Sequence, residues 1–356
     1  MKSADTPRTI PFVKIYEEKL IDALRIQGVD IYTYKDIHNF LIGTSHLKKN
    51  AERWLCWMIT LHIIPLNRYK WGPKMFDIQE YWEIVQYYFK SNPQNPLSVV
   101  SLEFEEIIQS DIESGKMCIF STAEDLSISK ESMSDAIFRI QRIFAVIIKE
   151  SESKSGFQYM EGFSALAAIT YAVNLKFAEE GKLNKDYAEA ACYYMLRSII
   201  SILPFTRIAS TKETFLAHFE EVDNAIREEA PEQAKLIERN NTQSFIYAKS
   251  WEAVLFVTLH NARDTIIIWD QILGRMERLT DIVESILIAH IIQATLPQNP
   301  INVTEFIENY STWNLEQLIS DALRIMEHQK TCKQEMLSFF CPKLKKYHGY
   351  QLHGIF

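Results

Sequence analysis

Helical periodicity runs through almost all of this 356-residue chain, and few residues interrupt it. Only ten glycines and eleven prolines are present, and alternating strand patterns are scarce. Apolar residues recur at steps of three and four over 131–149 and 78–90, which predicts amphipathic helices. Further helices are predicted over 186–203, closed by Pro204, and over 281–296, opened by a capping pair of Asp281 and Glu284. The sequence therefore predicts an all-α fold.

The predicted helices differ in how much of their surface is apolar. The segment 281–296 is apolar on most sides, which predicts a helix buried within a large bundle. Segments rich in Ser, Asn, Asp, Glu or Pro predict a loop over 91–98, an irregular excursion over 114–131 and a charged turn over 150–156. We predict a separate leading segment over 1–45, a main domain over 46–330 and a tail over 331–356, with basic residues at Lys343, Lys345 and Lys346.

Composition excludes several classes of function. The formal charge is −8 and the basic residues are scattered, so nucleic acid is not an expected partner. The five cysteines are odd in number and far apart, which predicts reduced thiols in a cytoplasmic protein. No paired Cys or His spacing predicts a metal site, and no cofactor is expected. No segment is predicted to span a membrane, because the longest uncharged run contains Pro297 and Pro300.

Five short landmarks follow one another in a definite order. They are Arg53-x-x-x-Trp57 with Pro65 eight residues later, Ile108-x-x-Asp111-Ile112, Tyr159-Met160-Glu161-Gly162-Phe163, Trp251 with Phe256, and Ile268-Trp269-Asp270-Gln271-Ile272-Leu273. Each landmark alone is weak, but their order and spacing over some 220 residues are specific. Over residues 48–330 this series resembles the TBC domain, a helical module that activates Rab-type GTPases. The resemblance implies a large multi-helix domain with two helical subdomains in a V shape, and a role in vesicle trafficking.

The resemblance also implies where the functional residues lie. The second family motif reads Ile-x-x-Asp-Val-x-Arg-Thr and the third reads Tyr-x-Gln-Gly, so Asp111, Ile112, Tyr159 and Gly162 are the matching GTPase-binding motif positions. In this family the motif arginine stabilises charge on the phosphates, and the motif glutamine orients the attacking water. Ser114 stands at the arginine position and Glu161 at the glutamine position. Neither catalytic residue is therefore intact.

The remaining landmarks have structural interpretations. Trp57, Trp251 and Trp269 are expected in the core because aromatic side chains bury large areas. Arg53 is expected to bond to the domain's own backbone or to a carboxylate, and Asp270 to cap or pair internally. Asp111 is expected to fix the loop that carries the motif. Gly162 is expected where the chain turns closely, for a backbone reason.

Three functions fit this pattern. The first is a protein that binds a Rab-like GTPase with little or no activation of hydrolysis, and so is a regulator rather than an enzyme. The second is an active GTPase activator that uses an unusual arginine or lysine from a shifted loop, or the GTPase's own glutamine. Lys116, Arg139 and Arg142 are the basic residues to test, although both arginines are expected to be solvated on a helix surface. The third is a helical scaffold that contacts no GTPase. The first is expected to be cytoplasmic and recruited peripherally to endomembranes through its partner.

Overall fold

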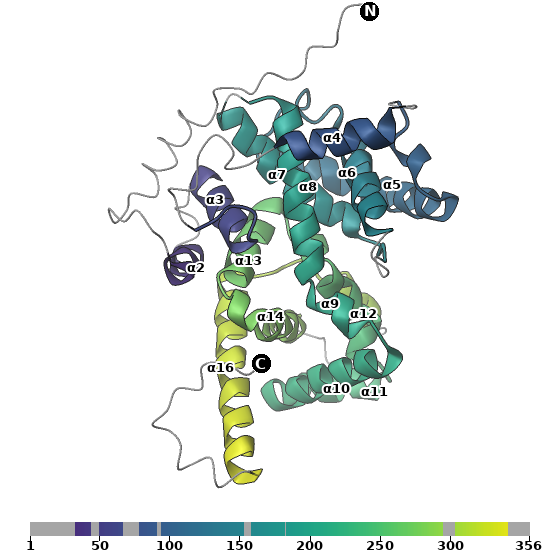
Figure 1. Cartoon of the computed structure of the whole chain (residues 1–356). Coiled ribbons are helices and arrows are strands. Elements are labelled where there is room, and N and C mark those ends of the chain that lie inside the picture. The colour runs from purple at the N-terminus through teal and green to yellow at the C-terminus, as the bar shows by residue number, and fades with distance from the viewer. Residues whose placement is uncertain are drawn as a thin grey trace, which may run out of the picture. The chain divides into compact units, whose positions relative to one another are not determined.

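The computed structural model describes residues 33–43, 50–66, 78–90, 94–152, 158–181, 183–294 and 303–340. Over these ranges the chain forms helices and no strand (Figure 1), which confirms the all-α prediction. It divides into two compact units, Met1–Leu216 with Tyr247–Leu279, and Ala217–Ile246 with Thr280–Phe356. Residues 1–32, 91–93, 153–157 and 341–356, on which several of the predictions above fall, lie outside the described residues.

The first unit contains the sequence landmarks. Its helices are α2 (Tyr34–Ile42), α3 (Asn50–Thr60), α4 (Ile78–Phe89), α5 (Leu102–Asp125), α6 (Ala136–Ser151), α7 (Phe163–Glu180), α8 (Lys185–Ile202), α9 (Pro204–Ile208) and α13 (Ala262–Leu273). Short 3₁₀ turns lie at Pro96–Val99, Val257–Leu259 and Met276–Arg278. Three helices, α10 (Lys212–Glu229), α12 (Ser244–Ala253) and α14 (Leu279–Gln293), cross a boundary between the units.

Helix α7 is the centre of the first unit. It packs against α3, α5, α6 and α8, and every residue from Phe163 to Leu175 is buried. Alanines at five positions of this helix let its neighbours approach closely, while Phe163 and Phe177 fill the larger spaces. Phe177 stacks on Trp54 of α3 with ring centroids 3.9 Å apart. Burial on all sides removes the amphipathic pattern by which a helix is recognised in a sequence.

The second unit is built from α11 (Pro231–Arg239), α15 (Val303–Glu308), α16 (Leu315–Phe340) and most of α10 and α14. Its core contains Phe219, Val222 and Ile226 of α10 with Leu318 and Ile325 of α16. Glu229 ties the two helices together, because its carboxylate accepts hydrogen bonds from Arg324 Nη1 and His328 Nδ1, each at 2.5 Å. Residues 282–291 of α14 are buried, as predicted for the segment 281–296.

Helix boundaries agree with the sequence in some places and not in others. Helix α4 spans 78–89 and α8 spans 185–202, close to the predictions of 78–90 and 186–203. The irregular excursion predicted over 114–131 is wrong up to residue 125, since α5 runs unbroken from Leu102 to Asp125. Burial of Ile119, Thr122 and Ala123 on one face of α5 outweighs the loop-like composition. Asp281 lies inside α14, which begins at Leu279, so the predicted capping pair is wrong.

Two elements lie at the predicted domain boundaries. Helix α2, in the predicted leading segment, packs on α3 and α13. The contact with α13 requires a glycine, because a Cβ at Gly274 would lie 2.5 Å from Ile42 Cγ2. At the other end, α16 continues past residue 330, where we placed the end of the main domain. The division into 1–45, 46–330 and 331–356 stays a prediction.

Candidate functional site

Asp111 joins the second and third motifs. Its carboxylate accepts three hydrogen bonds. Two come from the loop before α7, at 2.7 Å from Gly162 N and 2.7 Å from Tyr159 Oη, and one comes from the first turn of α7, at 2.8 Å from Ser164 N. Its backbone carbonyl accepts a fourth, from Ser164 Oγ at 3.1 Å. Burial and the nearby Asp111 charge raise the pKa of Tyr159 well above its ordinary value, so the phenol stays a donor. This junction holds α5 against the start of α7.

Two glycines allow this close approach. Gly162 has φ +92°, and a Cβ there would lie 2.8 Å from Val254 Cγ1. The left-handed backbone and the contact together explain the glycine, as expected from the sequence. Gly115 stands where the family motif has threonine, and a Cβ there would collide with Ser164 Oγ. Because residue 115 of α5 has no side chain, the Ser164 side chain of α7 can pack directly against α5.

The four matching motif positions lie inside or at the edge of this junction. Asp111 and Ile112 are only 5 % and 3 % exposed, and Tyr159 and Gly162 are half-buried. The hydrogen bonds of Asp111 are all internal to the domain. These residues therefore shape the surface that carries Ser114 and Glu161, and a direct GTPase contact by them stays a prediction.

Ser114 and Glu161 flank the junction on its exposed side. Ser114 lies one helical turn after Asp111, and Glu161 directly precedes Gly162. Both residues are exposed. The Ser114 hydroxyl donates to the Ser110 carbonyl at 2.9 Å, so it is turned back onto its own helix. Because Asp111 binds Gly162 N and Tyr159 Oη, the two residues are presented from segments that are bonded to each other.

The outward face of α5 adds apolar side chains beside Ser114. Met117 is 78 % exposed, Phe120 46 % and Ile107 39 %. Met117 follows Ser114 by three residues, so the two are neighbours on the helix surface. Sequence reasoning missed Met117 and Phe120 because it treated the chain from 114 as irregular. The buried positions Ile108, Ile112 and Ile119, read as one continuous helix, would have shown which residues face outward.

The basic residues considered as substitutes lie elsewhere. Arg139 and Arg142 of α6 are not solvated, contrary to expectation, since their side chains are only 12 % and 16 % exposed. Both bind the fully buried Glu189 of α8, at 2.6 Å from Arg139 Nη1 and 2.5 Å from Arg142 Nε. Burial alone would lower the pKa of Arg139, but Glu189, Asp135 and Asp186 outweigh it and raise the pKa. The buried carboxylate of Glu189 needs positively charged partners, and this explains why Arg139 and Arg142 are buried beside it.

Lys116 is also turned away from Ser114. Its ammonium lies 3.4 Å from Glu113 Oε1, and its side chain is 45 % exposed. Two residues along a helix correspond to a rotation of about 200° around the axis. Lys116 therefore projects from the opposite side of α5 to Ser114.

The remaining landmarks form a buried framework in the first unit. Arg53 Nε donates to the Asp270 carboxylate at 3.0 and 3.2 Å, and Trp57 Nε1 donates to the same carboxylate at 2.9 Å. Asp270 therefore pairs internally, and Arg53 binds a carboxylate, as expected. Trp57, Trp251 and Trp269 are at most 3 % exposed, which confirms their place in the core. Pro65 follows α3 and is exposed.

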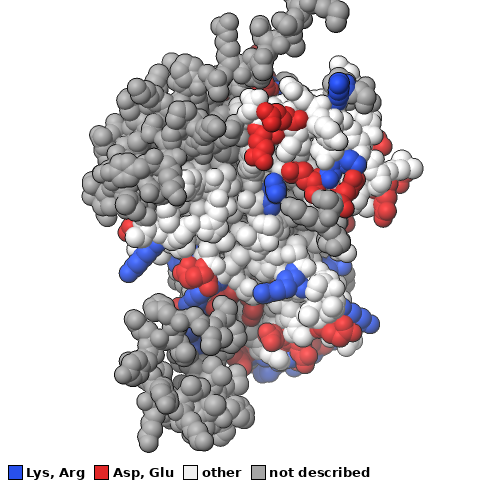
Figure 2. All heavy atoms as spheres, in the orientation of Figure 1, with Lys and Arg blue, Asp and Glu red and all other residues white. Residues whose placement is uncertain are grey.

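One face of the molecule carries charges of both signs. On the face shown in Figure 2, acidic and basic side chains are interspersed among the described residues. This agrees with the scattered lysines and arginines in the sequence. Among the helices that the structure describes, none is both long and apolar enough to cross a bilayer.

Comparison with known proteins identifies the family. A family model described as the Rab-GTPase-TBC domain matches residues 50–295. The crystal structure of the Ypt/Rab-GAP domain of Gyp1p superposes with a TM-score of 0.62 at 13 % sequence identity, covering 89 % of this chain and 99 % of that one. A comparison with curated proteins finds no match.

The chain belongs to the TBC family of Rab GTPase-activating proteins. This family regulates small GTPases, which implies a Rab-like GTPase as partner. The structural match to Gyp1p supports the same all-α fold.

Proposed function

We propose that this chain binds a Rab-type GTPase through the outward face of α5 and the Glu161 loop, and leaves GTP hydrolysis almost unchanged. The observation that carries the proposal is the pair Ser114 and Glu161, exposed beside the intact Asp111 junction. The framework that presents the two motifs is retained, while both working side chains are replaced. The protein would then sequester, localise or scaffold its GTPase.

The two replacements remove the chemistry that activation requires. An arginine supplied to the phosphates is worth about 10³–10⁵ in rate. The Ser114 hydroxyl is short, uncharged and already bonded to Ser110, so it cannot take that place. An ionised Glu161 adds a negative charge near a triphosphate. At a separation of about 6 Å and an effective dielectric constant of about 20, that repulsion is roughly 3 kcal/mol per charge pair.

The alternative of an active enzyme needs a cation from another position. Arg139 and Arg142 are committed to buried Glu189, and moving either would leave that carboxylate uncompensated. Lys116 projects from the far side of α5. None of the three basic residues weighed in the sequence therefore supports activation.

The central experiment measures GTP turnover by a panel of Rab proteins with and without this protein. We expect less than about a tenfold change, against the 10³–10⁵ typical of an arginine supplied in trans. A larger acceleration of any member of the panel would refute the lack of activation. Turnover measurements alone do not test binding, so a binding assay accompanies them.

The binding assay uses two equally exposed side chains on different helices. Met117 beside Ser114 and Tyr87 on α4 are both 78 % exposed. We expect Met117→Glu to weaken binding of the responding Rab at least about tenfold, because a charge is placed in an apolar contact. Tyr87→Glu should leave binding unchanged. Absence of binding in every nucleotide state would instead favour a scaffold that contacts no GTPase.

Localisation follows from the partner. We expect the protein to be cytoplasmic and to reach endomembranes peripherally, through a membrane-attached Rab. In this reading its place in vesicle trafficking depends on GTPase binding, and Met117→Glu should release it from membranes.

A further inference from the structure

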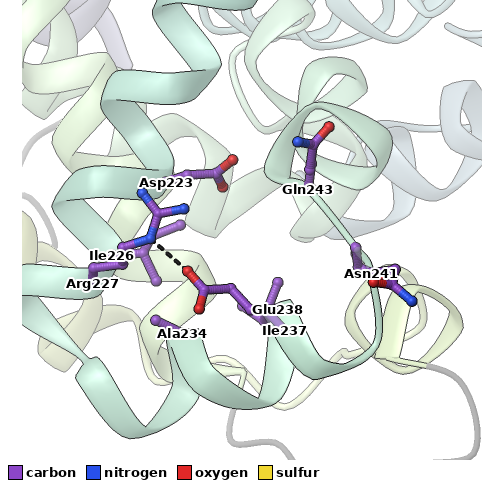
Figure 3. A pocket seen from close by; sticks show the side chains of 9 residues that line it. Asp223, Ile226, Arg227, Ala234, Ile237, Glu238, Asn241 and Gln243 are labelled. Atoms are coloured by element: carbon purple, nitrogen blue, oxygen red, sulfur yellow. Dashed lines mark hydrogen bonds and ion pairs between the residues drawn. The ribbon is translucent and has the colours of Figure 1, made fainter.

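The second unit contains an open pocket that is separate from the surface around Ser114. It lies where α10, α11 and the turn leading to α12 meet, and its volume is about 370 Å³ (Figure 3). That size falls at the lower end of ligand pockets in proteins. Nothing in the proposed GTPase contact uses it, since all of its lining residues lie within Asp223–Gln243.

The charges at this pocket do not balance. Glu238 Oε1 accepts from Arg227 Nε at 2.5 Å, and Arg227 Nη1 also donates to Asn224 Oδ1 at 2.5 Å. This pairing neutralises Glu238 and leaves Asp223 as a second carboxyl group at the same pocket. Two carboxyl groups and one guanidinium give a local charge of about −1 when all are ionised. The pocket therefore favours a cation.

One carboxylate oxygen of Asp223 is hydrogen-bonded to the backbone. Its Oδ1 accepts from the Ser244 N–H at 3.2 Å, at the start of α12. In Figure 3 its carboxyl group points into the open pocket. Burial raises the pKa of Asp223 above its ordinary value even though Ser244 and Arg227 oppose the change. A bound cation would relieve this cost of keeping the carboxylate ionised.

The base of the pocket is apolar. It is formed by Ile237 and Ala234 of α11 and Ile226 of α10, each at most 5 % exposed. Asn241 and Gln243 are exposed and bring amide groups to the rim. Asn241 has φ +50°, a left-handed conformation that asparagine tolerates well. The turn at Asn241 determines the positions of the Asn241 and Gln243 side-chain amides.

We propose that this pocket binds a lysine side chain from an extended basic segment of a partner protein. The lysine stem lies over the apolar base of the pocket, and its ammonium donates to the Asp223 carboxylate. A lysine ammonium is a compact point charge that a single carboxylate oxygen can hold. The Ser244 N–H uses only Oδ1 of Asp223.

The test uses the full chain and a labelled, end-capped peptide of sequence Gly-Ser-Lys-Ser-Gly as probe, with no GTPase present. We expect saturable binding that is lost when the lysine is Nε-acetylated. Equal binding of the acetylated peptide, or no saturable binding up to about 1 mM, overturns the proposal.

Substitutions then locate the site. Asp223→Asn keeps a carbonyl oxygen for Ser244 N–H but removes the charge, so we expect about tenfold weaker binding or more. Glu228→Gln removes one charge from an exposed residue of the same helix outside the pocket and should change nothing. Gln243→Lys places an ammonium at the exposed rim without touching the core, and should also weaken binding. Unchanged binding by both Asp223→Asn and Gln243→Lys contradicts the assignment.

A last variant separates a partner's lysine from the chain's own basic tail. We replace Lys343, Lys345 and Lys346 by glutamine in the full chain. Binding of the probe should be unchanged. Tightening by about tenfold would mean that the tail competes for the pocket, which overturns the assignment to a partner protein.

Discussion

Gly162 has the most demanding backbone position at the site. Its φ of +92° and the 2.8 Å separation between a built Cβ and Val254 Cγ1 both oppose any side chain. We expect Gly162→Ala to lower the free energy of unfolding by about 1–3 kcal/mol. Gly181, at the other end of α7 with φ −82°, is the control, and Gly181→Ala should change stability by less than about 1 kcal/mol. Urea unfolding measures both, and equal effects would contradict the backbone explanation.

His260 makes stability depend on pH. Burial lowers the pKa of His260 to about 4 from an ordinary 6.5. Between these values the unfolded chain binds more protons than the folded one, so the free energy of unfolding falls as the pH drops from 6.5 to 4. His260→Asn should reduce this loss of stability between pH 6.5 and 4. Urea unfolding across that range checks the prediction, and parallel curves for parent and variant would contradict it.

At the scale of elements, the Asp270 carboxylate connects α3 to α13. Its side chain is fully buried and binds both Arg53 and Trp57. Asp270→Asn leaves the Arg53 guanidinium without its buried counter-charge. We expect a loss of about 3–5 kcal/mol in the free energy of unfolding, measured by urea denaturation. As a control, Glu232→Gln breaks the exposed pair with Lys235 and should cost less than about 1 kcal/mol. Similar losses from the two variants would contradict this role of Asp270.

The sequence predicts elements well where packing leaves one side to solvent. Helix α4 follows from its three- and four-residue apolar steps almost to the residue, and α8 ends just before Pro204, as predicted. Helix α7 does not, because burial on all sides erases the periodicity. Helix α5 was mistaken after residue 114 because serine, aspartate and glutamate favour loops in isolation. Its contact with α7 at Gly115 and Ser164 depends on residues 49 positions apart in the chain, which local patterns do not report.

The site was predictable only in part for the same reason. The order of the motifs predicts that Ser114 and Glu161 stand at the positions of the motif arginine and glutamine, and this stays a prediction. In the structure both residues lie beside one buried aspartate. The exposure of Met117 and Phe120 depends on the register of α5. The burial of Arg139 and Arg142 depends on Glu189, a charge on another helix. Contacts between helices that are distant in the sequence can be identified only from the tertiary structure.

At the scale of the whole molecule, the framework and the working residues are separable. Arg53, Asp270, Asp111 and Gly162 hold the first unit together without requiring a side chain at 114 or 161. Ser114 and Glu161 are both exposed, so replacing them leaves the core and the junction untouched. Gly115 must be kept, because threonine there would collide with Ser164. We therefore expect variants with substitutions at Ser114 or Glu161 to fold.

This separation predicts that activity is restored by the double substitution Ser114→Arg and Glu161→Gln. The arginine supplies charge to the phosphates and the glutamine orients water, so turnover of the bound Rab should rise at least about tenfold, toward the 10³–10⁵ that an arginine provides. Ser114→Arg alone should give less, because Glu161 still repels the phosphates. Adding Met117→Glu should abolish the gain through lost binding. A double variant that binds its Rab as tightly as the parent but shows no gain would mean that these two positions do not face the nucleotide, because charge and hydrogen-bonding groups act only where they reach the phosphates.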